Sequence, residues 1–137
     1  MTSENVDSLR RGFEAFARGD IDAVEEVIDP EFEIENSILI DALPSVRGVA
    51  ALQVNTDKVR EAFGDFTWKP QEIIEVGDRI LVRVHIAGEG RSTALPMEQL
   101  SPNLDIGHLW TLRDGRAISL RIFRTWDEAR AAAGLRD

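Results

Sequence analysis

The sequence predicts an α+β fold in which helices near the N-terminus cover one face of a mostly antiparallel sheet. Three observations lead to this prediction. Apolar residues recur every three or four positions through residues 6–28 and 49–63, which is the period of an amphipathic helix. From Phe66 onward the period falls to two, as in β-strands. The dipeptide Asp114-Gly115 separates two apolar runs and favours a tight hairpin turn.

Two helices are expected before Pro30. Ser3 is placed to cap the first helix and Gly19 to end it. Asp20 is placed to cap the second helix, and Pro30 ends it because the residue before a proline avoids helical angles. The expected buried stripes are Val6, Leu9, Phe13 and Phe16 in the first helix, and Ile21, Val24, Val27 and Ile28 in the second.

A strand and a third helix are expected next. Residues Glu31–Ile34 begin to alternate, so that Phe32 and Ile34 share one strand face. The third helix follows Gly48, and a glycine at position 64 is placed to end it. Its expected buried stripe is Val49, Leu52, Val59 and Phe63.

The rest of the chain predicts four strands and a short final helix. Pro70 interrupts the first of these strands, and Gly77-Asp78 forms a turn before the second strand, Ile80–Ala87. Residues Gly88–Asn103 are rich in turn formers and are expected to form an irregular segment or a long hairpin end, centred near Pro96-Met97. The last two strands flank Asp114-Gly115, and the capping box Thr125-Trp126-Asp127-Glu128 starts a helix that runs to about Ala133 and ends at Gly134.

The hairpin turn predicts a strand register. Antiparallel partners keep a constant index sum, so a pair of Arg113 with Arg116 fixes the pairs beyond it. These are Leu109 with Leu120, Gly107 with Ile122, and Asp105 with Arg124. One hairpin face is then apolar and is interrupted only at the end away from the turn, as expected of a ligand pocket with a few polar groups in an apolar wall.

Composition narrows the functional classes. At 137 residues and 43% hydrophobic content, the chain is expected to form one domain over residues 1–137. The 25 acidic residues outnumber the 16 Lys and Arg, and the net charge of −9 disfavours nucleic acid and anionic membranes as partners. The absence of Cys excludes disulfides and cysteine-ligated metals. Without an apolar signal core near the N-terminus, the expected location is cytoplasmic.

Four segments resemble the nuclear transport factor 2-like superfamily, particularly its SnoaL-like branch of polyketide cyclase and ketosteroid isomerase relatives. They are FEAFARGDIDAVEEVIDPEFEIE, the pair Arg47-Gly48, HLWTLRDGRAISLRIF and WDEARAAAGL. The resemblance implies a cone-shaped fold, with a strongly curved sheet wrapped around the N-terminal helices and a pocket between them. It also implies a homodimer, for which the outer sheet face is the expected contact. Members of this superfamily include isomerases, aldol cyclases, epoxide hydrolases, dehydratases and noncatalytic binding domains.

The catalytic residues of these relatives are only partly matched. In the ketosteroid isomerase pattern, which is a standard example of pKa tuning, the carboxylate base falls at Glu35 or Asn36. The tyrosine of that pattern is absent, and its aspartic acid falls near Gly107 or His108. The Arg–Asp–Asp set of the epoxide hydrolases maps onto Arg83, His85 and about Ile122. A polyketide cyclase-like site needs one carboxylate, and Asp105 meets that requirement.

Asp105 and Arg124 form the first candidate catalytic pair, and they are predicted on the side of the sheet that faces the pocket. In a functional site, Asp105 acts as acid and base while Arg124 binds a carboxylate or enolate oxygen. The alternative is a salt bridge at the rim of the sheet, which contributes little.

His85 and His108 form the second candidate set. With the preceding hairpin centred near Pro96-Met97, a polar row His85–His108–Arg121 crosses the sheet, and Arg83 faces Trp110. Either histidine has the intrinsic pKa of a general base. The row is expected on the outer face, because the opposite face is more apolar; a bulge in the strand that holds His85 would turn that residue inward.

In addition to Gly107, four residues are candidates for ligand binding. Glu35 is either a base at the pocket floor or a solvated charge, and Asn36 follows it. Trp68 and Ile122 would line an apolar cavity, although packing in the core is the commoner role of such residues. No nucleotide-binding, serine hydrolase or metal-binding motif is present. We therefore expect a protein that binds a small organic molecule without a cofactor or metal, either as a cyclase or isomerase-type enzyme or as a noncatalytic module.

Overall fold

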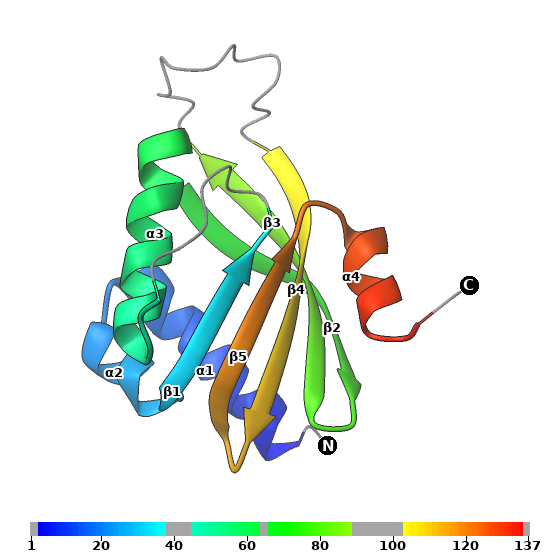
Figure 1. The fold of residues 1–137 in the computed structure, drawn as a ribbon, viewed down its shortest axis with the longest axis horizontal. Helices are drawn as coiled ribbons and strands as arrows, with labels where there is room; N and C mark the ends of the chain where they lie inside the picture. Colours follow the sequence, from blue (N-terminus) through cyan, green and yellow to red (C-terminus); the bar gives the residue numbers. More distant parts are fainter. Residues whose placement is uncertain (1–2, 38–44, 64–65, 89–102, 136–137) are drawn as a thin grey trace.

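The computed structural model describes residues 3–37, 45–63, 66–88 and 103–135 (Figure 1). The predicted helix end at position 64 and the hairpin centre near positions 96–97 lie outside these residues. The elements in chain order are α1 (Glu4–Arg18), α2 (Ile21–Glu26), β1 (Ile28–Asn36), α3 (Val49–Phe63), β2 (Phe66–Val76), β3 (Arg79–Gly88), β4 (Asn103–Arg113), β5 (Arg116–Phe123) and α4 (Trp126–Ala132).

Most helix boundaries follow from their capping residues, as predicted. The Ser3 hydroxyl accepts a hydrogen bond from the Val6 N–H at the start of α1, and Gly19 ends that helix with φ 73°. Thr125 caps α4 by accepting from the Glu128 N–H. The predicted end of the second helix at Pro30 is wrong: α2 stops at Glu26 because the chain then pairs with β5, and the Val27 carbonyl accepts from the Ala117 N–H.

The five strands form one sheet in the order β1-β5-β4-β3-β2. β1 runs parallel to β5, and the other three pairings are antiparallel, so the predicted α+β class with a mostly antiparallel sheet is confirmed. Strong curvature of this sheet and a dimer through its outer face stay predictions. Within the described residues, no helix is both long and apolar enough to cross a membrane.

Helices cover both faces of the sheet. We call the face under α1, α2 and α3 the inner face and the face under α4 the outer face (Figure 1). The main core lies on the inner face, where Phe32, Val82, Ile106, Trp110 and Leu120 are buried. A smaller core on the outer face joins Leu81, Leu109 and Phe123 to Ala129 and Ala133 of α4.

The hairpin turn between β4 and β5 forms as predicted, but the register beyond it differs. Asp114 and Gly115 have positive φ angles of 53° and 76°, and Arg113 pairs with Arg116. Between the pairs Leu112–Ala117 and Thr111–Ser119, β5 holds one additional residue. This bulge shifts every later pair by one position. The predicted pairs Leu109–Leu120, Gly107–Ile122 and Asp105–Arg124 are therefore wrong; the observed pairs are Trp110–Leu120, Leu109–Arg121, His108–Ile122 and Gly107–Phe123.

The register between β3 and β4 also differs from the prediction. His85 pairs with Asp105 rather than His108, and Arg83 pairs with Gly107 rather than Trp110. The predicted row His85–His108–Arg121 therefore does not form. Each of the two registers differs from the prediction by an odd number of residues. Because side chains alternate along a strand, an odd shift exchanges the two faces of β4. His108 lies on the inner face and Asp105 on the outer face, both contrary to expectation, whereas His85 lies on the outer face as predicted.

Candidate functional site

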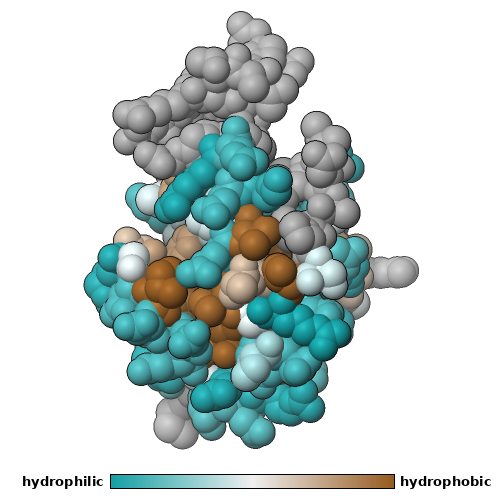
Figure 2. All heavy atoms as spheres, turned by 60° about the vertical axis from the view of Figure 1, so that its left-hand side comes forward, coloured by the Kyte–Doolittle hydropathy of each residue, from teal (hydrophilic) through white to brown (hydrophobic). Residues whose placement is uncertain are grey.

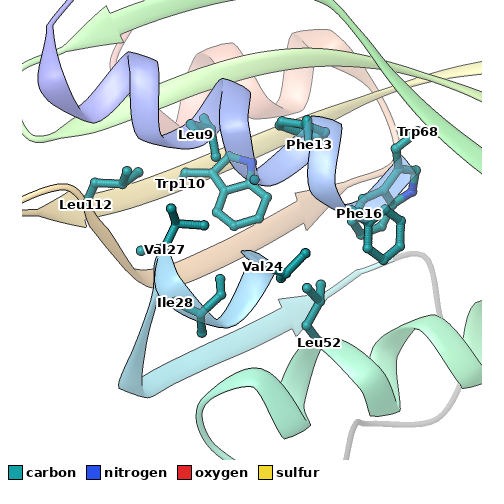
Figure 3. Close-up of a pocket in the computed structure, with 12 residues that line it drawn as sticks. Leu9, Phe13, Phe16, Val24, Val27, Ile28, Leu52, Trp68, Trp110 and Leu112 are labelled. Carbon is teal, nitrogen blue, oxygen red and sulfur yellow. The ribbon is translucent and has the colours of Figure 1, made fainter. Parts of the chain in front are cut away.

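A narrow cavity lies between the inner face and the first two helices (Figure 3). Its volume is about 30 Å³, and its lining is almost wholly apolar. The residues that line it are Leu9, Gly12, Phe13, Phe16, Val24, Val27, Ile28, Leu52, Trp68, Trp110, Leu112 and Ala117. The predicted Trp68 belongs to this lining. The cavity as it stands has room for about one water molecule, so a larger ligand requires side chains to move.

His108 lies at the polar end of this core and is wholly buried. Its Nδ1 atom accepts a hydrogen bond of 3.2 Å from the Trp110 Nε1–H, and the Phe13 ring stacks on it with centroids 6.2 Å apart. Burial lowers the pKa of His108 to about 3, so the ring is neutral near pH 7. Because Nδ1 is the acceptor, this hydrogen bond assigns the proton to Nε2. His108 is therefore a hydrogen-bond donor here, and the predicted role of general base does not suit it.

Trp68 contacts His108 directly from β2. The two ring centroids are 4.8 Å apart at an interplanar angle of 85°. Trp68 is only 6% exposed, and its Nε1 atom is buried without a hydrogen-bond partner among the described residues. Phe16 also stacks on the Trp68 ring, with the two centroids 5.0 Å apart (Figure 3).

Asn36 and Asn55 form a polar pair next to the row of paired strand residues that contains His108. Asn36 pairs with Ile122, which pairs in turn with His108, so all three share the inner face. The Asn36 Nδ2 group donates a 2.8 Å hydrogen bond to the Asn55 Oδ1 atom. Asn55 is wholly buried in α3, and its own Nδ2 group has no partner within the part of the chain that the structure describes.

Three buried N–H groups thus lack a partner among the described residues: His108 Nε2, Trp68 Nε1 and Asn55 Nδ2. We call them the inner donor set. Leaving a buried donor unpaired costs about 1–3 kcal/mol, and such groups are rare in folded proteins. All three are donors, so any group that pairs with one of them must be an acceptor, such as a carbonyl or enolate oxygen.

The second polar cluster lies on the outer face. The Asp105 carboxylate is 2.7 Å from His85 Nδ1 and accepts from Arg83 Nη2 at 3.1 Å. The hydrogen bond from His85 holds the pKa of Asp105 below its usual value, with help from Arg83 and against partial burial. Gln71 and Glu72 complete the open groove around this cluster. The predicted partner Arg124 is exposed beyond the end of β5 and does not pair with Asp105.

Two other predicted site residues also lie on the outer face. Glu35 is exposed and forms an ion pair with Arg121 at 3.4 Å, so it is not at the floor of the inner cavity. Gly107 was expected to leave room for a ligand, but α4 occupies that space: a Cβ atom at Gly107 would overlap the Ala129 Cβ atom.

Replacing Asp105 with asparagine is expected to change the free energy of unfolding by no more than about 1 kcal/mol, because the ion pairs of exposed side chains contribute little. The side chains of Asp105 and Arg83 are 39% and 41% exposed. Urea denaturation of both proteins at pH 7 measures this difference. A loss of several kcal/mol would show that the outer cluster is a structural element of the sheet and not a surface feature.

Sequence reasoning missed Asn55, Phe13 and Phe16 as site residues. Asn55 carried a usable signal, because it lies at a buried position of α3, between Leu52 and Val59, where an apolar residue is expected. Phe13 and Phe16 lie in a regular apolar stripe that core packing alone explains, so their contacts with His108 and Trp68 have no signature in the sequence.

The chain matches one family model, described as the SnoaL-like domain, over residues 9–120. No curated protein matches it. Solved structures with a similar fold include TerC, which was co-crystallised with polyporic acid; it has 22% sequence identity and a TM-score of 0.67, over 96% of this chain and 99% of that chain.

Two bacterial structures show comparable similarity. An NTF2-like protein of unknown function from Burkholderia pseudomallei has 22% identity and a TM-score of 0.66, over 95% of this chain and 97% of that chain. A protein from a Jannaschia species, described as a candidate SnoaL-like polyketide cyclase, has 21% identity and a TM-score of 0.66, over 98% of this chain and 94% of that chain. At these identities, the similarity establishes the fold.

Proposed function

The chain belongs to the SnoaL-like domain family, and from this premise we propose that it binds a small, largely apolar organic molecule against the inner face of its sheet. One oxygen atom of that molecule accepts hydrogen bonds from the inner donor set. The observation that carries this proposal is a set of three buried N–H groups that lack partners among the described residues, one of which belongs to Trp68 in the lining of an apolar cavity. Ligand pockets typically combine an apolar wall with a few polar groups that fix orientation.

The lining defines the chemical class of the ligand. Aromatic and aliphatic side chains favour an apolar body, and the inner donor set favours a carbonyl, enolate or phenolate oxygen. The crystallisation of TerC with polyporic acid supports a small organic ligand for this fold. The net charge of −9 gives no support to a nucleic acid as the ligand.

Proton-transfer chemistry of the cyclase or isomerase type is the finer form of this proposal. Its support is the description of the Jannaschia protein as a candidate polyketide cyclase. The inner donor set would stabilise an enolate oxygen, as donors in an oxyanion hole do. No carboxylate is among the residues that line the described cavity, and Asp105 lies on the outer face. We therefore favour binding over turnover, and a noncatalytic module is the alternative to an enzyme.

Two probes of nearly equal shape test the proposal. Acetophenone carries a carbonyl oxygen that can only accept hydrogen bonds, whereas ethylbenzene carries none. Calorimetric titration of the native protein is expected to show acetophenone binding about fivefold more tightly, since a hydrogen bond contributes roughly 1 kcal/mol. The advantage is expected to decrease in His108→Phe, which removes one of the three donors and keeps a ring in its place.

His85→Phe is the matched control, because it makes the same exchange on the outer face. This variant is expected to retain the preference for acetophenone. If neither probe binds the native protein, or if the two variants behave alike, the inner donor set is not the binding site.

A further inference from the structure

A groove on the surface continues the inner cavity outward between the first two helices and α3. Its volume is about 350 Å³, and Phe16 and Leu52 line both the groove and the cavity. Figure 2 shows hydrophobic side chains gathered on this side of the molecule, within a hydrophilic surround. The groove also contains Ile21, which is 37% exposed and is the one exposed large hydrophobic residue among those described.

Phe16 separates the groove from the cavity. Its ring is half-buried and lies nearly parallel to the Trp68 ring, with centroids 5.0 Å apart and an interplanar angle of 24°. This is the geometry in which two planar rings stack. Phe16 therefore occupies a position that suits a flat ligand ring, next to a tryptophan whose Nε1–H has no partner among the described residues.

The helices on either side of the groove are attached to different parts of the sheet. α1 packs on β2 and β5 and also contacts α2, whereas α3 packs on β1. The far wall of the groove is a polar side of α3 that includes Gln53, Asp57 and Arg60. The groove thus combines a polar rim with an apolar floor, and the Phe16 ring is part of that floor.

We propose that the ligand enters through this groove, and that its planar aromatic or conjugated ring takes the place of Phe16 on the face of Trp68. The inference rests on the proposed function and adds the entrance, the displaced side chain and the shape of the ligand. It also accounts for the small volume of the cavity: with Phe16 on Trp68, only about 30 Å³ is open, whereas ligand pockets span roughly 300–1,000 Å³. Displacement of Phe16 joins the cavity to the groove.

Association kinetics test the entrance. Acetophenone is mixed with protein in a stopped-flow instrument, and quenching of tryptophan fluorescence reports binding. A minor conformation is typically populated at about 0.1–10%, so removal of the side chain that must move raises the association rate by about tenfold or more. We expect this increase for Phe16→Ala. Phe123→Ala is the matched control, because Phe123 is buried in the outer core and lines neither the cavity nor the groove, and its association rate is expected to stay within about twofold of native.

A second pair of variants leaves the core intact. Gln53→Trp places a large ring in the groove from an exposed position of α3, and it is expected to slow association by about tenfold. Glu61→Trp, which is exposed on the same helix but does not line the groove, is its control and is expected to bind at the native rate.

The outcomes separate the two proposals. Equal association rates in Phe16→Ala and Phe123→Ala, together with native rates in Gln53→Trp, would overturn the entrance while the proposed binding site stands. Absence of acetophenone binding to the native protein would overturn both. Slower association in Gln53→Trp alone supports the entrance even where Phe16→Ala fails to fold.

Discussion

Between pH 6.5 and 4.5, the native protein is expected to lose roughly 2–3 kcal/mol more of its free energy of unfolding than the His108→Phe variant. Burial lowers the pKa of His108 to about 3 in the folded state, while an unfolded histidine titrates near 6.5. Within this window the unfolded chain binds a proton at position 108 that the folded chain does not. Stability is therefore fully present above pH 6.5 and falls as the pH drops toward 3.

Urea denaturation at a series of pH values measures this effect. The His108→Phe variant is expected to be less stable than the native protein at pH 7, because Trp110 loses the acceptor for its Nε1–H. The quantity to compare is therefore the change in the free energy of unfolding with pH. His85→Phe is the control: it removes the only other histidine, from a partly exposed position on the outer face. Parallel pH profiles for native protein and His108→Phe would show that His108 is not held neutral in the core.

Replacing Gly107 with alanine is expected to destabilise the protein by about 3 kcal/mol, at the upper end of overpacking effects. The added Cβ atom would overlap the Ala129 Cβ atom and lie 3.1 Å from the Thr125 carbonyl oxygen. Both belong to α4 or its cap, so the helix must move away from the sheet and expose part of the outer core. Thermal or urea denaturation measures the loss.

The double variant Gly107→Ala/Ala129→Gly tests the cause. Glycine in a helix costs about 1 kcal/mol by itself. If the overlap is the cause, the double variant is more stable than the sum of the two single changes predicts, by about 1–3 kcal/mol. Simple additivity would contradict the close contact between α4 and β4, and would reopen the expectation that Gly107 lies beside a space for a ligand.

The fold was predictable because its signals are local. Ser3, Asp20 and Thr125 cap helices through side-chain oxygens, and Asp114-Gly115 adopts the positive φ angles that its turn requires. Such residues act on neighbours a few positions away, and a sequence displays those neighbours directly. The α+β class follows from the same signals combined with the change of hydrophobic period.

The site was less predictable, because strand register is not local. One additional residue in β5 moved His108 to the inner face and separated Asp105 from Arg124. A signal for this bulge exists in the bulky residues of each strand. Trp110 on β4 and Leu120 on β5 face each other only if β5 contains the additional residue, and that pairing gives the more apolar inner face.

The two histidines illustrate the consequence. His85 and His108 were expected to share one polar row, yet His108 is wholly buried as a neutral donor whereas His85 holds the Asp105 carboxylate in an open groove. Their chemistry follows from burial and partners and not from the residue type. His108 supplies an N–H group to the inner donor set because it is buried on the inner face, where His85 is not.

A crystal of the protein soaked with acetophenone shows directly which face of the sheet binds the probe. We expect the probe on the inner face, with its carbonyl oxygen within about 3 Å of His108 Nε2 and with the ring against Trp68. A probe bound in the outer groove beside Arg83 and His85, with the inner cavity unchanged, would contradict the proposal that the inner donor set binds the ligand.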